Sequence, residues 1–197
     1  KTPFIVKWPG IVKPGQKTDS LISVVDIAPT IINVAGLKPA NTFQGRSFAS
    51  ILKNPQEKIR DYIFAEHNWH DYQAHKRAVR SKKYLYIRNA FPELSLSPPA
   101  DAVRSMTYQK MIELYKQGKL TPEQSVCFET PRPVEELFDV EKDPYELKNV
   151  VGDPGYKNVL ITMQNALNEW MIWTDDKIPE NPTPDKFDRF TGTRIDS

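Results

Sequence analysis

The sequence predicts an α/β protein in which a four-stranded antiparallel sheet packs on a long C-terminal helix. Runs rich in β-branched, aromatic and aliphatic residues predict the strands, at residues 62–65, 77–80, 84–88 and 134–138. After Asp153-Pro154, apolar residues recur three and four positions apart. That repeat predicts a helix of about five turns that covers one face of the sheet. Seventeen prolines against eight glycines indicate a chain rich in loops.

The first 60 residues follow a different pattern. Pro3–Trp8 is apolar on both faces, which predicts a strand inside a covered sheet. Residues 20–37 predict a strand and then a buried helix, with Asp26 as its N-cap, Pro29 in its first turn and Gly36 at its C-cap. Because the chain enters a strand at once, with no Met and no signal peptide, we expect it to be the C-terminal part of a larger protein.

Charge and cysteine content argue against several classes of protein. The chain carries 27 basic and 25 acidic residues, a net charge of +2, and so lacks the basic excess of proteins that bind nucleic acid or membrane surfaces. Asp26 and Pro29 interrupt the longest apolar run near the start, so that run cannot span a bilayer. The single cysteine, Cys127, excludes an internal disulfide framework and a cysteine-based zinc site. Its apolar neighbours favour a small buried hydrophobe over a nucleophile.

Residues 90–133 are predicted to form an insertion, because prolines mark both of its ends. One helix is expected around Met106–Gln117. A capping box at Thr121-Pro122-Glu123-Gln124 predicts a second helix at 122–128. The last residues, 176–197, are rich in proline and polar residues, which predicts an extended surface segment or disorder.

All three histidines of the chain, His67, His70 and His75, lie between the strand at 62–65 and the hairpin at 77–88. Every side chain whose ordinary pKa is near neutrality is therefore in one loop that rigid strands hold. Polar and aromatic side chains that converge on such a loop suit a small polar ligand. The alternative is a solvated loop that contains a few histidines, and composition alone does not decide between the two.

The same loop contains residue types that could bind a metal, in His67, His70 and Asp71. However, the spacing His67-x-x-His70 on an irregular loop lacks the i, i+4 helical arrangement of a typical zinc site. A contact with a polar substrate, or a purely structural role, is therefore favoured over a metal.

Four basic residues gather at the predicted hairpin. Strand alternation sends Arg77 and Arg80 to opposite faces, so only some of the four can point at the loop. Arginine suits a carboxylate or a sulfate, because its planar fork donates two parallel hydrogen bonds. Lys82 and Lys83, in the turn, are expected to be solvated.

Several stretches together resemble one family. The segments that are similar to the run after the catalytic core of sulfatases are Pro3–Gly10, Val25–Thr30 with Gly36, and Gln44–Ser47. The segments that are similar to the hairpin and the closing strand and turn of that family are Ala78–Ile87 and Leu137–Asn149. Each stretch is weak alone, but their order and spacing cover about residues 3–175. Within the family, Asn68–Tyr72, residues 98–133 and the closing helix resemble the heparan N-sulfatase (N-sulfoglucosamine sulfohydrolase) branch.

The resemblance implies an alkaline-phosphatase-like α/β fold with this domain organisation. Residues 1–60 would end the catalytic domain and form the edge of its large sheet. Residues 61–175 would form the smaller C-terminal subdomain, with the insertion at 90–133, and 176–197 would be an extended tail.

The resemblance also implies hydrolysis of a sulfamate or sulfate ester on a glycosaminoglycan sugar. The family uses a formylglycine, made from Cys or Ser in a C/S-x-P-x-R motif, and a bound Ca²⁺. That motif does not occur here, since Cys127 has the wrong spacing. Both groups are therefore expected in an N-terminal catalytic part, and the fragment alone is expected to be inactive. No catalytic residue and no metal ligand is assigned in this chain.

What carries over from the family is substrate recognition. His70 and Asp71 match positions where the N-sulfatase branch places sugar-contacting residues. His67 and Asn68 lie on the same loop, and Arg80 completes the predicted substrate-binding set. The implied partners are a sulfated glycosaminoglycan or sulfated sugar and the N-terminal part of the same protein, with no nucleic acid and no membrane. The implied location is secreted, periplasmic or lysosomal.

Two other functions remain open at this stage. One is a non-catalytic polysaccharide-binding module that uses the same loop. The other is a different hydrolase of the alkaline-phosphatase-like superfamily.

Overall fold

The computed structural model describes residues 3–195. The chain divides into two compact units. The first contains the residues up to Phe64 together with Arg80–Lys82, and the second contains Ala65–Val79 and the residues from Lys83 onward. Within the described residues, no helix is long and apolar enough to cross a membrane.

The first unit contains a 3-10 turn, η1 (Val24–Asp26), and two helices, α1 (Ile27–Val34) and α2 (Ala49–Lys53). The helix α1 was predicted, but the predicted strands are wrong: neither residues 3–8 nor the residues before α1 form a strand. A strand needs a neighbour for its backbone hydrogen bonds, and no segment of the described chain pairs with residues 3–8. Ile5 is accordingly 91% exposed, and the predicted burial of α1 fails at Ile31, which is 61% exposed.

Asp26 organises the first unit and is fully buried. It stands at the N-cap position of α1 but makes no side-chain cap bond there, which corrects the prediction. Its carboxylate instead accepts the backbone N–H groups of Ser23 at 2.8 Å and Arg46 at 2.7 Å, and it forms an ion pair with Arg60. Gly45 allows this approach, because a Cβ there would lie 1.9 Å from the carbonyl oxygen of Val25. Two of the stretches that resemble sulfatases are thus joined through Asp26.

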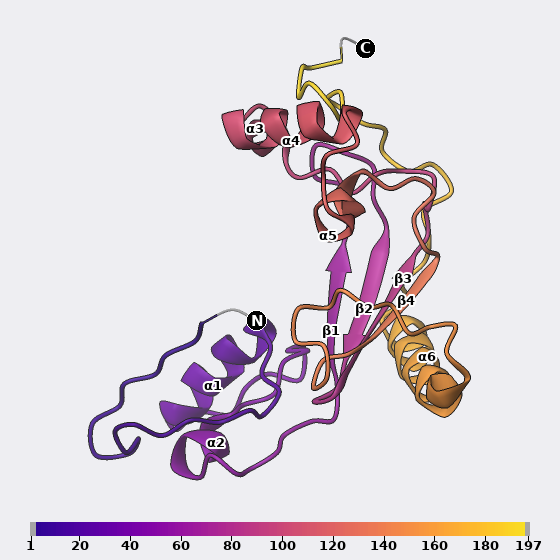
Figure 1. Ribbon diagram of the computed structural model, residues 1–197. Helices are drawn as coiled ribbons and strands as arrows, with labels where there is room; N and C mark the ends of the chain where they lie inside the picture. Colours follow the sequence, from indigo (N-terminus) through magenta and orange to yellow (C-terminus); the bar gives the residue numbers. More distant parts are fainter. Residues whose placement is uncertain (1–2, 196–197) are drawn as a thin grey trace. The chain divides into compact units, whose positions relative to one another are not determined.

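The four predicted strands are confirmed, each shifted by at most two residues. They are β1 (Ile63–His67), β2 (Lys76–Arg80), β3 (Tyr84–Asn89) and β4 (Glu135–Asp139), in the spatial order β1-β2-β3-β4 (Figure 1). β3 and β4 are antiparallel, with Tyr86 opposite Leu137. Both side chains are fully buried, as is Val79 of β2. Burial of these apolar side chains fixes the register of the sheet, because a one-residue slip would expose them.

The long C-terminal helix is also confirmed. α6 (Lys157–Trp173) follows a short 3-10 turn, η3 (Pro154–Tyr156), and lies beside β3 and β4 (Figure 1). It buries Met163, Ala166 and Leu167, which share one face at the predicted three- and four-residue spacing. The helix therefore covers the sheet as its sequence pattern predicts.

The insertion contains α3 (Ala100–Val103), α4 (Met106–Lys116), α5 (Pro122–Ser125) and a 3-10 turn, η2 (Val126–Phe128). The capping box is confirmed: the Thr121 hydroxyl accepts the N–H of Gln124, and the Gln124 side chain accepts the N–H of Thr121. Cys127 is half-buried, and burial raises the pKa of its thiol, which disfavours the thiolate.

Residues 176–195 lie against the insertion and against loop 68–75, which connects β1 and β2. Phe187 packs on the buried cluster of Tyr72, Ala100 and Val103. Gly192 has φ +67°, and a Cβ there would lie 2.7 Å from the carbonyl oxygen of Ala100, so this close approach requires glycine. In Figure 1 the tail, drawn in yellow, lies with α3 and α4 at the end of the sheet where β1 finishes. The tail thus contributes to the same end of the sheet as the histidine loop.

Candidate functional site

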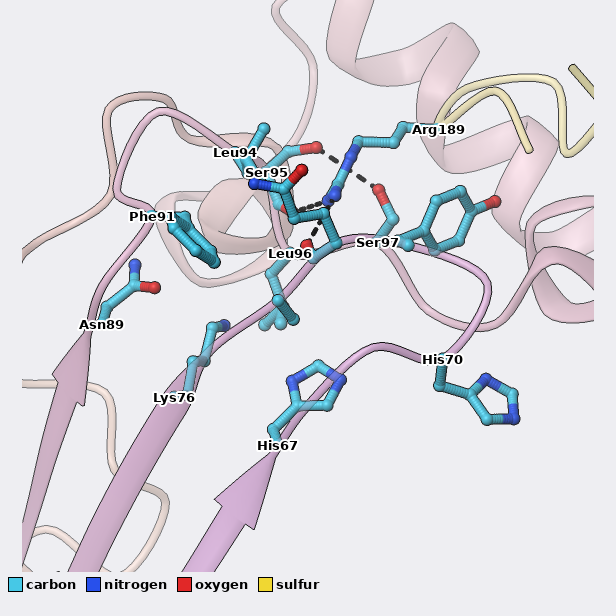
Figure 2. Close-up of a pocket in the computed structure, with 13 residues that line it drawn as sticks. His67, His70, Lys76, Asn89, Phe91, Leu94, Ser95, Leu96, Ser97 and Arg189 are labelled. Atoms are coloured by element: carbon cyan, nitrogen blue, oxygen red, sulfur yellow. Dashed lines mark hydrogen bonds between the residues drawn. The ribbon is translucent and has the colours of Figure 1, made fainter. Parts of the chain in front are cut away.

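A pocket lies at this end of the sheet, within the second unit. β1 ends at His67, β2 begins at Lys76 and β3 ends at Asn89, so strands that run in alternating directions bring these three residues to one edge. Figure 2 shows the three side chains rising from neighbouring strands into the pocket. The segment Leu94–Ser97 from the insertion and Arg189 from the tail close it.

Arg189 holds the walls of the pocket together. Its guanidinium forms a bidentate ion pair with Asp185 at 2.6 and 2.8 Å, and it donates to the backbone carbonyls of Ser95 at 2.7 Å and Gln73 at 2.8 Å. Its charged group also lies 5.1 Å from the centre of the Tyr72 ring. One tail residue therefore fixes both loop 68–75 and the segment Leu94–Ser97 of the insertion. Charge-assisted bonds of this kind are the stronger hydrogen bonds in proteins.

The backbone of loop 68–75 is fixed at further points. Asp71 has a positive φ of +64°, a left-handed conformation that aspartate tolerates better than most residues. Its carboxylate accepts the backbone N–H of Ala100 at 2.9 Å, at the start of α3, and its carbonyl accepts the N–H of Lys186 at 2.8 Å. Gln73 donates its backbone N–H to Asp185 at 2.7 Å. The loop is thus held in one conformation by side chains and backbone from the insertion and the tail.

The pocket is electropositive. No aspartate or glutamate is among its lining residues. Burial, and then the charge of Arg132, lower the pKa of Lys76 to about 8. Burial, and then the charge of Lys76, also lower the pKa of His67. Within residues 3–195 the Lys76 ammonium has no ion-pair partner, and Glu136, whose charge acts on it, pairs with Arg132 at 3.7 Å.

An unused hydrogen-bond donor also lines this pocket. Asn89 is 2% exposed, and its amide nitrogen has no hydrogen-bond partner in the described chain. A buried donor without a partner costs about 1–3 kcal/mol, so such groups call for a physical explanation. A ligand oxygen in the pocket would accept this N–H. The pocket therefore combines a cation and a free donor, which together suit an anionic oxygen group.

The structure brings only part of the predicted substrate-binding set together. His67 faces the pocket, whereas the ring of His70 points away from it at the mouth and its side chain is 68% exposed (Figure 2). Asn68 lines a neighbouring hollow and donates to Glu66 at 3.3 Å. Arg80 lies at the opposite end of β2 from Lys76, in the first unit. Whether these residues contact a sugar remains a prediction.

Sequence reasoning missed Lys76, Asn89 and Arg189. The signals for the first two were positional, since Lys76 directly follows His75 at the start of β2 and Asn89 ends β3. The prediction began the second strand at residue 77 and ended the third at 88, and so left both residues outside the strands. Arg189 gave no comparable signal, because Ser95 and Gln73, the partners through which it joins the pocket walls, are distant in sequence.

The described residues do not fit the cofactors that the resemblance implies. Within residues 3–195, no group of three or more His, Cys, Asp or Glu side chains is placed to hold a metal ion. The motif that yields formylglycine does not occur in the sequence.

Comparison with known proteins gives consistent matches. Residues 1–94 match the family model for N-sulphoglucosamine sulphohydrolase, C-terminal. An ulvan-active sulfatase of Formosa agariphila is 39% identical over 91% of this chain and 30% of its own length. Human N-sulphoglucosamine sulphohydrolase is 23% identical over 86% of this chain and 38% of its own length. The chain thus spans about a third of the curated relatives it matches, with 30% and 35% of the first two.

Two solved structures share the fold. One is a protein in complex with its substrate D-glucosamine-2-N,6-O-disulfate, with a TM-score of 0.63 and 17% identity over 89% of this chain and 29% of its own. The other is a 2-O GAG sulfatase, with a TM-score of 0.58 and 21% identity over 95% of this chain and 34% of its own. These likenesses bear out the predicted alkaline-phosphatase-like α/β class with its four-stranded antiparallel sheet and long C-terminal helix.

Proposed function

Because this chain belongs to the sulfatase family, we propose that the whole protein hydrolyses sulfate esters or sulfamates on the sugars of a sulfated polysaccharide. In this proposal, the region described above recognises the sugar and does not supply the nucleophile. The observation that carries the proposal is the electropositive pocket between three strand ends, where the Lys76 ammonium and the amide N–H of Asn89 have no partner among residues 3–195.

The pocket residues have distinct roles in this proposal. The Lys76 ammonium pairs with an anionic group of the sugar, and Asn89 donates to one of its oxygens. His67, at the C-terminal end of β1, donates or accepts a hydrogen bond with a sugar hydroxyl, according to which ring nitrogen carries the proton. Arg189 acts as a positioning residue, because its donors are already used by Asp185 and by backbone carbonyls. Buried polar groups that only the right ligand satisfies give strong discrimination between sugars.

The sugar class is proposed at two levels of detail. The broad level is a sulfated polysaccharide, because the relatives include proteins named for ulvan and for N-sulphoglucosamine. The finer proposal is an N-sulfated glucosamine of a heparan-type chain, supported by the family match over residues 1–94. We further propose that formylglycine and Ca²⁺ are held by parts of the protein outside this chain. We also propose that the protein works in a secreted, periplasmic or lysosomal compartment.

The test is release of sulfate by the full-length protein from a panel of heparan-type and ulvan oligosaccharides, with matched phosphate esters. We expect turnover of sulfated sugars that exceeds turnover of the phosphate esters. Faster phosphate release would assign the protein to another hydrolase of the superfamily. Binding of the oligosaccharides without any turnover would make it a polysaccharide-binding module.

Two matched variants test the recognition site itself. His67→Ala is expected to lower kcat/KM on the preferred oligosaccharide by about tenfold, the loss of one hydrogen bond to a sugar hydroxyl. His70→Ala, at an exposed ring directed away from the pocket, is expected to change it less than threefold. A larger loss for His70→Ala would instead support the role that the family resemblance implies for that residue.

A further inference from the structure

A second hollow of about 300 Å³ adjoins the first pocket. It lies between loop 68–75 and the tail residues 177–183, and Gln73 and Ala74 line both spaces. We infer that this hollow is a second sugar subsite, which binds the uncharged ring face of the sugar next to the one held at Lys76. This inference rests on the proposed function, because it takes the ligand to be a polysaccharide.

The charges around the second hollow are paired within the protein. Arg77 is buried and forms a bidentate ion pair with Asp176, with both N–O distances at 2.7 Å. Lys177 pairs with Asp175 at 2.8 Å. An anionic ligand would have to compete with these carboxylates. The second hollow therefore differs from the first pocket, and suits a ligand surface without charge.

Trp69 supplies an aromatic surface for such a ligand. It lines the hollow and is 38% exposed. Its indole N–H donates to the carbonyl of Pro184 at 2.8 Å, so the ring is held in place rather than free to rotate. A tryptophan with an anchored polar edge and an open apolar face can pack against the C–H face of a pyranose ring. A fixed ring also loses little conformational entropy when a ligand binds.

Polar groups that are not used within the described chain surround this aromatic surface. The side-chain amides of Gln73 and Asn181 line the hollow and make no hydrogen bond among residues 3–195. His75 is 4% exposed, and its Nε2 atom has no hydrogen-bond partner there. Burial, and then the charge of Arg77, lower the pKa of His75, so the neutral imidazole is favoured. Amides and a neutral imidazole both donate and accept, which matches sugar hydroxyls.

The position of the hollow also agrees with a polymeric ligand. Gln73 and Ala74 line both spaces, so the two are neighbours, and in this inference one oligosaccharide spans them. The first pocket would hold the charged group of one sugar, and the second hollow would hold the ring of its neighbour. A monosaccharide would occupy only the first.

The experiment compares short and long substrates in the full-length protein. Trp69→Ala is expected to lower kcat/KM for a sulfated tetrasaccharide by about tenfold, and for the matching monosaccharide by less than twofold. The control is Trp173→Ala, which removes a tryptophan that is 66% exposed on α6, and it should change neither value. Trp69→Phe keeps an aromatic face and loses the N–H bond to Pro184, and it should retain activity within about threefold of the parent.

Two kinetic outcomes would overturn the subsite. One is an equal loss for Trp69→Ala on both substrates or no loss on either. The other is a loss for Trp69→Phe as large as for Trp69→Ala, because Trp69 would then act only through its bond to Pro184.

Calorimetry separates the subsite from the proposed function. A chemically desulfated tetrasaccharide is expected to bind the parent protein and to bind Trp69→Ala about tenfold more weakly. Equal binding by the two proteins, or no binding by the parent, overturns the subsite even where sulfate release is measured. A protein that releases no sulfate contradicts the proposed function, and the same calorimetric comparison still decides whether the subsite exists.

Discussion

Asp26 in the first unit and Arg189 in the second each hold irregular segments together through one charged side chain, but over different distances along the chain. The partners of Asp26 lie 3, 20 and 34 residues away. Those of Arg189 include Asp185, 4 residues away, but also Ser95 and Gln73, 94 and 116 residues away. Contacts across longer loops cost more chain entropy to close. The second arrangement therefore depends on the tail returning to the sheet.

Asp26 and Arg189 differ from Lys76 in whether the fold supplies a partner for their charge, and this difference bears on function. Asp26 and Arg189 both have a partner of opposite charge within the fold. Lys76 is partly buried and has no ion-pair partner among residues 3–195. A buried charge that is paired inside the protein contributes to the fold, whereas one that is unpaired is costly until a ligand neutralises it. The following predictions test this distinction.

The largest effect is expected for Asp26→Ala. This change leaves the Arg60 side chain, only 12% exposed, without its carboxylate, and Arg60 Nε already has no partner in the described chain. The free energy of unfolding should fall by about 3–5 kcal/mol, the usual cost of removing one partner of a buried pair. Urea unfolding measures it. Asp61→Ala, in an exposed pair with Lys58, is the control and should cost less than about 1 kcal/mol.

A double variant sharpens this prediction. Asp26→Leu with Arg60→Leu removes both charges and should be less destabilising than Asp26→Ala alone. If the double variant is as unstable as the sum of the two single variants, the ion pair is not the reason for the loss, and the backbone bonds of Asp26 to Ser23 and Arg46 are.

The next effect is expected for Arg189→Gln. The variant loses the ion pair with Asp185 and at least one of the bonds to Ser95 and Gln73, which should lower the free energy of unfolding by about 2–4 kcal/mol. Hydrogen exchange should accelerate at the backbone N–H groups of Gln73 and Lys186, because the loop and tail then separate. Oligosaccharide affinity should fall at least tenfold, because Arg189 no longer holds the pocket-lining residues Ser95 and Gln73 in place.

Arg194→Gln is the matched control for Arg189→Gln. Arg194 lies in the same tail and is exposed, and its backbone pairs with Phe187. Its replacement should leave both hydrogen exchange and sugar affinity unchanged. Fast exchange in the control, or slow exchange in Arg189→Gln, would show that the tail is not held through Arg189.

The parts of the fold that sequence predicted well depend on local physics. The capping box at Thr121 and Gln124 joins residues that are three positions apart in the sequence. The buried apolar face of α6 follows from the helical period alone. The strands of the sheet were also found, because their hydrophobic runs are short and bounded by turn residues.

The errors arose where a pattern depends on distant partners. Pro3–Trp8 has the composition of a strand, but strand formation also requires a neighbour. The tail was predicted to be an extended surface segment or disorder, and its composition did not reveal the contacts of Arg189, Phe187 and Gly192 that order it against the insertion and loop 68–75. In the site, sequence found the histidine loop but not Lys76 or Asn89, since which strand ends share an edge is known only once the strands are paired.

A smaller effect, of opposite sign on stability, is expected for Lys76→Met. The pKa of Lys76 falls from 10.5 to about 8 in the folded chain. Between these two values the unfolded chain holds a proton that the folded chain releases, so the free energy of unfolding rises with pH across that window. Below about 8 both states are protonated and the cost of the buried charge is complete. Lys76→Met removes that cost and should raise the free energy of unfolding at pH 7 by about 1–3 kcal/mol.

Ligand binding by the same variant should change in the other direction. The charged form of Lys76 binds an anion, so the affinity of the parent for a sulfated oligosaccharide should fall as pH rises through about 8. Lys76→Met should bind about tenfold more weakly at pH 7 and lose this pH dependence. Lys82→Met, at a lysine that is 61% exposed, is the control and should keep it. A pH dependence that persists in Lys76→Met would assign it to another group.

The smallest effect is expected for Asp71→Asn, which separates a structural role from a sugar contact. Asparagine tolerates the positive φ of this position, and its side-chain oxygen can still accept the N–H of Ala100. Stability should therefore change by less than about 0.5 kcal/mol, and oligosaccharide affinity by less than threefold. Asp71→Ala, which loses both features, should cost about 1–2 kcal/mol. If Asp71→Asn instead loses tenfold in affinity at unchanged stability, its charge contacts the sugar, as the family resemblance implies. In that case the bond to α3 only orients a residue that belongs to the binding site.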